Sequence, residues 1–253
     1  MKIFFALFFL GLVQGITEFL PVSSSGHLVL FSKIFGVEES LFISILLHCA
    51  TLLSIVVVFY KDIFKMIRHP FSKETLSIVV ATIPTCLIAL VLMPIIKKSF
   101  SGGVLPVCFL ISALLLLLSE TIFARKGSGE LNLKTAFFIG IAQGFAVFPG
   151  ISRSGSTIAT GLMCGAEKKE VAKFSFMMSI PIIILSLFLE VYEVLVEKVS
   201  LNIQIFPTIM AFLTAFVVGV FSIKAMIKLT QKSKLKWFAL YLAAISVVSF
   251  FVL

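Results

Sequence analysis

The sequence predicts an all-α, polytopic membrane protein with an inverted-topology repeat, built from six full spans and two re-entrant helix pairs in a single membrane domain, residues 1–253. Three observations predict this class. Hydrophobic residues make up 60% of the chain and charged residues 13%, whereas a soluble domain carries roughly 25% charged residues. Apolar stretches approach the roughly 20 residues that a helix needs to cross a bilayer, without the alternation of barrel strands. Two polar runs interrupt them, and they resemble each other.

These polar runs are an internal repeat. The runs GLVQGITEFLPVSSSGH at residues 11–27 and GIAQGFAVFPGISRSGS at residues 140–156 align at an offset of 129 residues. Repeat one then covers about 1–128 and repeat two about 129–253. A bilayer tolerates irregular backbone only where it is buried in protein or lines a wet cavity, so both runs are candidates for the functional site.

In the first half, residues 3–20 form an apolar helix that Pro21 stops, and a short helix follows at about 27–36. Neither the break nor the short second piece suits two complete crossings. We therefore expect a re-entrant pair that enters and leaves on one side. The three spans that follow it are expected at 41–60, 75–96 and 104–123.

The second half repeats this plan. Residues 134–148 and 154–165 form the second re-entrant pair, and the spans follow near 173–192, 205–227 and 236–253. Because each half has an odd number of spans, the second half is inverted relative to the first, as in many transporters.

The basic residues support this topology. The segments 61–73, 125–134 and 224–236 fall on one side, which the positive-inside rule makes cytoplasmic, while Glu38 and Glu39 fall outside. With Lys168 inside, the two polar tips enter from opposite sides and meet near mid-membrane. The net charge of +9 therefore belongs to short loops, and we expect no nucleic-acid partner.

In the first tip Glu18 follows Gln14 by four residues, so both side chains share one helix face. A carboxylate at this depth costs a few kcal/mol or more unless it is paired or hydrated, which favours a functional role. The alternative is a structural Glu18 bonded to a neighbouring helix or to Arg153, and a Gln14 that only bonds across helices.

Ser23, Ser24, Ser25 and His27 place three hydroxyls beside an imidazole just after the helix break. This composition is typical of an activated nucleophile with a general acid or base. The residues alone do not choose among the hydroxyls. Capping of the short second helix would explain one serine, but it would not explain His27.

The second tip predicts a phosphate site. Ser152, Arg153, Ser154 and Thr157 lead into a helix whose free N–H groups would bind an anion, and a guanidinium forks onto phosphate. Arg153 is the only basic residue between Lys134 and Lys168, so a solvated loop is disfavoured.

Other polar residues of the spans are interpreted structurally. His48 lies in the middle of a span, where a bond across helices is the favoured interpretation and an approach to the site the alternative. The four cysteines form no CxxC pair, which is typical of structural thiols.

At this point the residues resemble a known family. QGITEFLPVSSSGH and PGISRSGST are similar to the two signature motifs of the bacterial undecaprenyl-diphosphate phosphatases of the bacitracin-resistance type. Gln14 and Glu18 fit the first motif, and Pro149, Arg153 and Thr157 fit the second. The resemblance extends over essentially the whole chain in length and hydropathy.

This resemblance implies dephosphorylation of undecaprenyl diphosphate to undecaprenyl phosphate, the lipid carrier of cell-wall synthesis, in the bacterial cytoplasmic membrane with the site facing its outer side. It implies a catalytic group of Glu18, Ser24, His27 and Arg153, with Ser152, Ser154 and Thr157 beside the phosphate. It also implies a divalent cation, Mg²⁺ or Ca²⁺, on Glu18 and Gln14. Since Gln14 is the neutral variant at its position, a tightly held metal is less expected here.

Two other classes of function stay open. A transporter or flippase of a phosphorylated polyprenyl lipid would use the same inverted repeat and broken helices, with Arg153 and the tips binding the lipid, and Ser24 need not react. A structural membrane scaffold would need no phosphate chemistry from Arg153. Assembly into a homo-oligomer is compatible with the sequence under each of these hypotheses.

Overall fold

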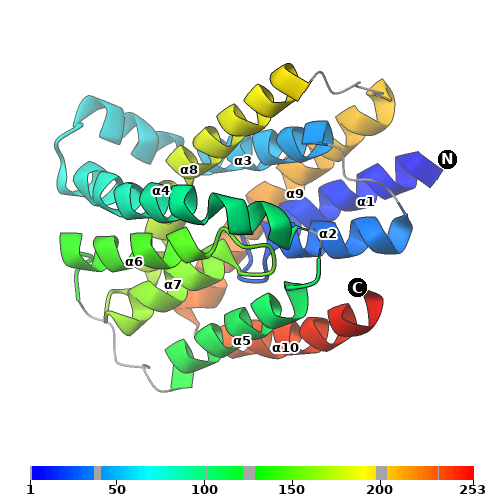
Figure 1. Ribbon diagram of the computed structural model, residues 1–253. Coiled ribbons are helices and arrows are strands. Elements are labelled where there is room, and N and C mark those ends of the chain that lie inside the picture. The colour runs from blue at the N-terminus through cyan, green and yellow to red at the C-terminus, as the bar shows by residue number, and fades with distance from the viewer. Residues whose placement is uncertain (1, 37–40, 101, 122–128, 198–203, 233) are drawn as a thin grey trace.

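The computed structural model describes residues 2–36, 41–100, 102–121, 129–197, 204–232 and 234–253. Within them the chain folds into helices packed side by side, with no strand beyond one isolated bridge between Gly129 and Ala166 (Figure 1). The helices are α1 (Lys2–Thr17), α2 (Ser24–Phe35), α3 (Leu41–Arg68), α4 (Lys73–Ser99), α5 (Leu105–Thr121), α6 (Leu133–Phe145), α7 (Arg153–Met163), α8 (Lys168–Glu197), α9 (Ile205–Gln231) and α10 (Leu235–Val252). The all-α prediction is confirmed.

Among the described residues, five helices are long and apolar enough to cross a membrane. They are Phe42–Arg68, Lys73–Ile96, Lys168–Val196, Ile205–Gln231 and Leu235–Val252. The sixth predicted span, 104–123, is represented by α5, whose 17 residues are at the lower end of the usual range. Glu38 and Glu39, and residues 122–128 of the expected connection to the second half, lie outside the described residues. The chain is a multi-pass membrane protein.

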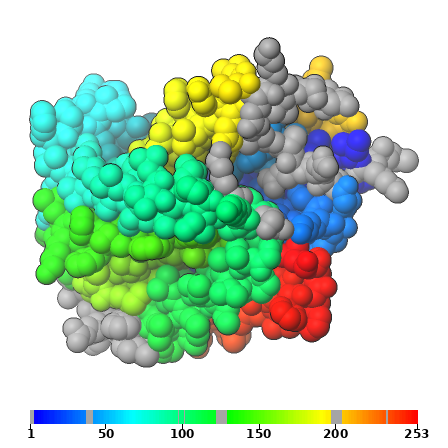
Figure 2. Space-filling view, in the orientation of Figure 1, coloured from blue at the N-terminus to red at the C-terminus, as the bar shows by residue number. Residues whose placement is uncertain are grey.

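The outer surface of the bundle agrees with this class. Large aliphatic side chains on α4, among them Leu87, Leu90 and Val91, are 60%, 63% and 77% exposed. Figure 2 shows α4 spread across the face of the molecule that is in view. Water would disfavour so continuous an apolar surface, but lipid accepts it.

Both predicted helix breaks are present, and their bounds follow from local chemistry. α1 ends at Thr17, three residues earlier than expected, because Pro21 has no N–H to bond the Thr17 carbonyl. α2 begins at Ser24 because the Ser23 hydroxyl caps it, accepting from the Gly26 N–H at 3.4 Å. Ser152 caps α7 in the same way. Re-entry of each pair on one side of the membrane stays a prediction.

The two halves pack through equivalent contacts. α1 lies against α9, and its counterpart α6 lies against α4. Gly11 of α1 and Gly140 of α6 correspond in the repeat, and a Cβ on either would overlap the backbone carbonyl of a facing alanine, Ala211 or Ala81. Close approach of transmembrane helices at small residues is a general packing mode. It brings the ends of α1 and α6, and hence both tips, to the middle of the bundle.

This packing predicts that Gly140→Ala destabilises the protein. The added methyl group meets backbone rather than a movable side chain, and overpacking of this kind costs ~1–3 kcal/mol. We expect a lower midpoint of thermal unfolding in detergent for Gly140→Ala. Gly103→Ala is the matched control, because a Cβ there meets nothing within 4 Å. Equal midpoints for the two variants would contradict the close contact of α6 with α4.

Candidate active site

The two polar tips lie against each other near the centre of the molecule (Figure 1). The Gly150 N–H donates to Ser23 Oγ at 3.1 Å, and Ser154 Oγ donates to the Leu20 carbonyl at 2.9 Å. A serine hydroxyl of each tip thus forms a hydrogen bond with a backbone group of the other tip. The irregular backbone is buried in protein, as a bilayer requires.

This interlock needs unusual backbone. Ser23 adopts φ of 70°, which is uncommon for a residue with a side chain, and Gly150 adopts 92°. A Cβ on Gly26 would lie 2.8 Å from the Gly150 Cα, so the small residue permits the close approach. Ser112 of α5 holds the second tip by donating to the Gly150 carbonyl at 3.2 Å and accepting from the Ser152 N–H at 2.9 Å.

Glu18 is the centre of the site. Its carboxylate is 6% exposed, and one oxygen, Oε1, is ion-paired with Arg153 of the other tip. The other oxygen, Oε2, accepts the Ser24 hydroxyl at 2.5 Å and the Gln14 amide at 3.1 Å. Three of the four predicted catalytic residues therefore meet at one buried carboxylate: Glu18, which carries it, and Ser24 and Arg153, which bond it.

The hydrogen bonds of His27 go to groups other than Ser24. Its Nδ1 lies 2.7 Å from the Ser23 carbonyl, which can only accept, so Nδ1 carries the hydrogen. Its Nε2 then accepts from the Tyr241 hydroxyl of α10 at 2.7 Å. Within the described part of the chain His27 makes no hydrogen bond to Ser24, and it does not line the pocket described below.

Tyr241 was not predicted from the sequence as a residue of the site. It lies 129 residues after Ser112, so the repeat makes the two residues equivalent. Each of them holds one tip from a long helix, α5 or α10. The offset of 129 residues between the two repeats is therefore the sequence feature from which Tyr241 could have been predicted.

The hydroxyls predicted to bind phosphate support the second tip. Ser152 Oγ accepts from the Gly155 N–H at 3.0 Å, and Thr157 Oγ1 bonds the Arg153 carbonyl and Ser175 Oγ at 2.9 and 2.6 Å. The Ser154 hydroxyl donates to the Leu20 carbonyl of the first tip. Ser152, Arg153 and Ser154 all line the pocket described below, and the Arg153 side chain, 19% exposed, brings the positive charge of this tip to it.

A pocket of about 200 Å³ opens over this cluster. Glu18, Ser24 and Arg153 form part of its lining, and α3 and α8 add His48 and Glu190. An approach of His48 to the site was the alternative interpretation of its position in the sequence, whereas Glu190 was not predicted. The position of Glu190 inside the predicted span 173–192 could have identified it, because carboxylates within transmembrane helices are rare and are functional candidates by default.

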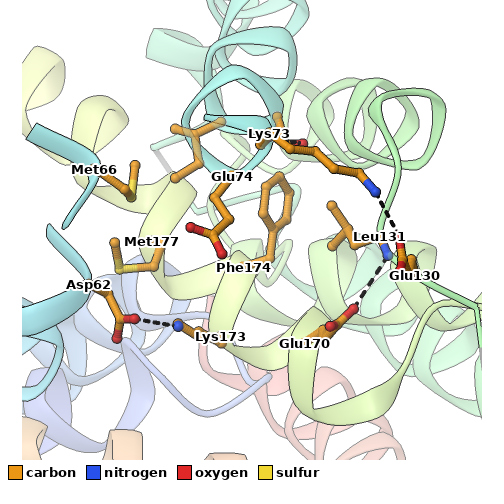
Figure 3. Close-up of a pocket in the computed structure, with 12 residues that line it drawn as sticks. Asp62, Met66, Lys73, Glu74, Glu130, Leu131, Glu170, Lys173, Phe174 and Met177 are labelled. Carbon is orange, nitrogen blue, oxygen red and sulfur yellow. Dashed lines mark hydrogen bonds and ion pairs between the residues drawn. The ribbon is translucent and has the colours of Figure 1, made fainter. Parts of the chain in front are cut away.

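A larger hollow, about 330 Å³, lies between α3, α4 and α8 at the end of the bundle that carries Lys65 and Arg68. The described part of its lining carries two lysines against four carboxylates, Asp62, Glu74, Glu130 and Glu170. Lys173 pairs with Asp62 at 2.5 Å, and Lys73 with Glu130 at 2.7 Å (Figure 3). Because this lining is net acidic and holds no arginine among the described residues, the hollow suits a phosphate less well than the pocket beside Arg153.

The oxygen atoms around Glu18 that could act as metal ligands do not fit a resident divalent cation. Both carboxylate oxygens are already bonded, and a guanidinium occupies the position where a cation would bind. The buried oxygens without a hydrogen-bond partner in this region, among the described residues, are Gln14 Oε1 and, in the lining of the pocket, Gln143 Oε1 and Glu190 Oε2. Within the described residues no three His, Cys, Asp or Glu side chains are arranged to hold a metal. Mg²⁺ or Ca²⁺ on Glu18 and Gln14 stays a prediction from the resemblance.

Comparison with known proteins agrees with the motifs. The family described as bacitracin resistance protein BacA matches residues 7–248. An undecaprenyl-diphosphatase of Carboxydothermus hydrogenoformans is 42% identical over 94% of this chain and 92% of its own. Relatives of the same name from Bacteroides fragilis and Thermosipho africanus are each 38% identical, over 97% and 96% of this chain and 96% and 98% of their own. The chain therefore belongs to the bacitracin resistance protein BacA family.

Proposed function

We propose that the protein hydrolyses undecaprenyl diphosphate to undecaprenyl phosphate and inorganic phosphate, which recycles the lipid carrier for cell-wall synthesis. The observation that carries the proposal is the bonding of one buried carboxylate, Glu18, to a hydroxyl and to a guanidinium from the opposite tip. A nucleophile, a proton acceptor and a phosphate-binding cation then line one pocket. The relatives that carry this activity in their names support the choice of substrate.

In the first step the terminal phosphate of the substrate binds Arg153, near the N-terminus of α7. Ser24 Oγ attacks the terminal phosphorus, the bond to the bridging oxygen breaks, and undecaprenyl phosphate leaves. The 2.5 Å hydrogen bond supports transfer of the Ser24 proton directly to Glu18. We propose this route in place of the transfer to His27 that the sequence suggested.

His27 then has a positioning role, since its bonds to Ser23 and Tyr241 join the first tip to α10. Ser152, Ser154 and Thr157 likewise hold Arg153 toward the phosphate. In the second step water cleaves the phospho-serine, and Glu18 returns the proton to Ser24.

The site is proposed to open to the outer side of the cytoplasmic membrane. His48 lies in the first third of α3, whereas Lys65 and Arg68 lie in its last turn. Glu190 lies near the end of α8, which begins with Lys168. The pocket is therefore nearer the ends that carry fewer basic residues, and the positive-inside rule makes these ends external. Apolar lining residues such as Ile182 and Ile183 suit the start of a polyprenyl chain.

A second candidate is transport of a phosphorylated polyprenyl lipid. The equivalent packing of α1 on α9 and of α6 on α4 favours it, because paired broken helices at a repeat interface are a transporter design. The two functions differ in whether Ser24 reacts.

Replacement of Ser24 by alanine tests the enzyme. We expect purified Ser24→Ala to lose phosphate release from undecaprenyl diphosphate while it still binds the lipid, because the pocket and Arg153 remain. Ser25→Ala is the control and should keep most of the release. Acid-quenched wild-type enzyme should carry phosphate on the peptide that contains Ser24. Release that survives in Ser24→Ala would rule out this nucleophile and favour the neighbouring hydroxyls or direct attack by water.

Arg153→Lys separates the charge of this side chain from its geometry. Lysine keeps a cation opposite Glu18 but loses the planar fork, so the folded state should persist while phosphate binding weakens. A hydrogen bond to a charged group is worth ~1.5–3 kcal/mol, which corresponds to a fall of about tenfold or more in kcat/KM. Steady-state kinetics and thermal unfolding of the same samples measure both effects. An unchanged kcat/KM would contradict phosphate binding by the fork.

We propose that the expected divalent cation enters with the substrate rather than as a resident ion, because phosphate oxygens would supply the ligands that the site lacks. Mg²⁺ titrated onto the substrate-free protein should then give no saturable heat by calorimetry, whereas EDTA should lower phosphate release. Micromolar binding of Mg²⁺ that is lost in Glu18→Gln would show a resident site instead.

A further inference from the structure

The reaction needs a second base, because Glu18 cannot serve both steps at once. After the first step Glu18 holds the proton that Ser24 must regain, so it cannot also take a proton from the incoming water. Attack is in line, and water must approach the phosphorus opposite Ser24, from the side that undecaprenyl phosphate has vacated. The structure offers two ionisable side chains that line the pocket and take no part in the first step, His48 and Glu190.

His48 of α3 is held in the tautomer of a base. Its Nδ1 lies 3.0 Å from the carbonyl and 3.4 Å from the hydroxyl of Ser44, one turn earlier. The nearer partner, the carbonyl, can only accept, so we assign the hydrogen to Nδ1. The lone pair is therefore on Nε2, which forms no hydrogen bond within the described part of the chain. Both nitrogens of His27, by contrast, are engaged.

Glu190 of α8 is the electrostatic partner of this imidazole. His48 lines the same pocket as Glu18 and Glu190, and it interacts electrostatically with both carboxylates. Glu190 Oε2 is buried and has no hydrogen-bond partner among the described residues. A buried unpaired carboxylate oxygen is costly, and a water or an imidazolium in the pocket would satisfy it.

We propose that His48 is the general base of the second step and that Glu190 stabilises the imidazolium that forms. The inference rests on the proposed function. The water oxygen bonds to the phosphorus of phospho-Ser24 as the bond from phosphorus to Ser24 Oγ breaks. One water proton goes to His48 Nε2, Ser24 Oγ regains its proton from Glu18, and inorganic phosphate leaves. His48 then gives its proton to the water that fills the pocket.

The test is to follow the two half-reactions separately by chemical quench. In His48→Gln the burst of undecaprenyl phosphate, one per enzyme, should persist, while release of inorganic phosphate falls by ~10²-fold or more. Phospho-Ser24 should accumulate to nearly one per enzyme. Glu190→Gln should shift the same two quantities in the same direction by a smaller factor, and Glu190→Asp should recover part of the rate.

Glu193→Gln is the control for charge at this end of α8, because Glu193 interacts electrostatically with Glu190 but does not line the pocket. It should change the two half-reactions by a smaller factor than Glu190→Gln does. For His48→Ala, imidazole added to the assay should restore phosphate release, which distinguishes a lost base from a damaged fold.

Three outcomes would overturn the inference. If His48→Gln and Glu190→Gln slow the burst and the release equally, the residues are structural. If Glu193→Gln behaves like Glu190→Gln, the effect belongs to the charge of this end of α8. If no phospho-serine can be trapped in any variant, the covalent intermediate and this inference fall together, whereas continued phosphate release would leave the proposed phosphatase activity in place.

Discussion

The buried ion pair between Glu18 and Arg153 is the interaction on which the rest of the structure depends. It joins the two halves of the chain at the point where both leave helical geometry. Removing one partner of a buried pair typically costs ~3–5 kcal/mol, because the remaining charge stays desolvated. In a bilayer this penalty restricts the tips to arrangements in which acid and guanidinium meet. The ion pair therefore sets the register of one tip against the other, and it fixes the carboxylate to which Ser24 donates.

The same contacts satisfy the polar backbone of the tips inside the membrane and arrange the side chains of the proposed active site. The Ser23 hydroxyl caps α2 and also accepts from Gly150, and Ser154 bonds Leu20 while its neighbour Arg153 faces the pocket. A loop in water could leave such groups to the solvent, but here each must find a protein partner. Ser23, Ser152 and Ser154 thus stabilise the tips, whereas the Ser24 hydroxyl reaches the central carboxylate.

The sequence predicted the class of fold and most of this cluster because both depend on local or repeated patterns. Hydropathy predicts the long helices, and the internal repeat relates the two motifs. A carboxylate and an arginine that both lie in apolar surroundings are expected to form an ion pair. It did not predict that the Glu18 carboxylate, rather than His27, would receive the Ser24 hydroxyl. That outcome depends on α10, more than two hundred residues away, whose Tyr241 takes the free nitrogen of His27. Glu190 was missed for a similar reason, since only the packing of α8 beside α3 brings it to the pocket.

Under the proposed function, the ion pair between Glu18 and Arg153 would also couple recognition to catalysis. Arg153 is paired with Glu18, and a single carboxylate neutralises it. The terminal phosphate of a diphosphate would bring more charge and more acceptor oxygens, so it would compete with Glu18 for the guanidinium. Glu18 would then keep its hydrogen bond to Ser24 but lose its cation, which would make it the stronger proton acceptor that the proposed attack needs. In this mechanism part of the free energy of phosphate binding would be used to uncouple Glu18 from Arg153.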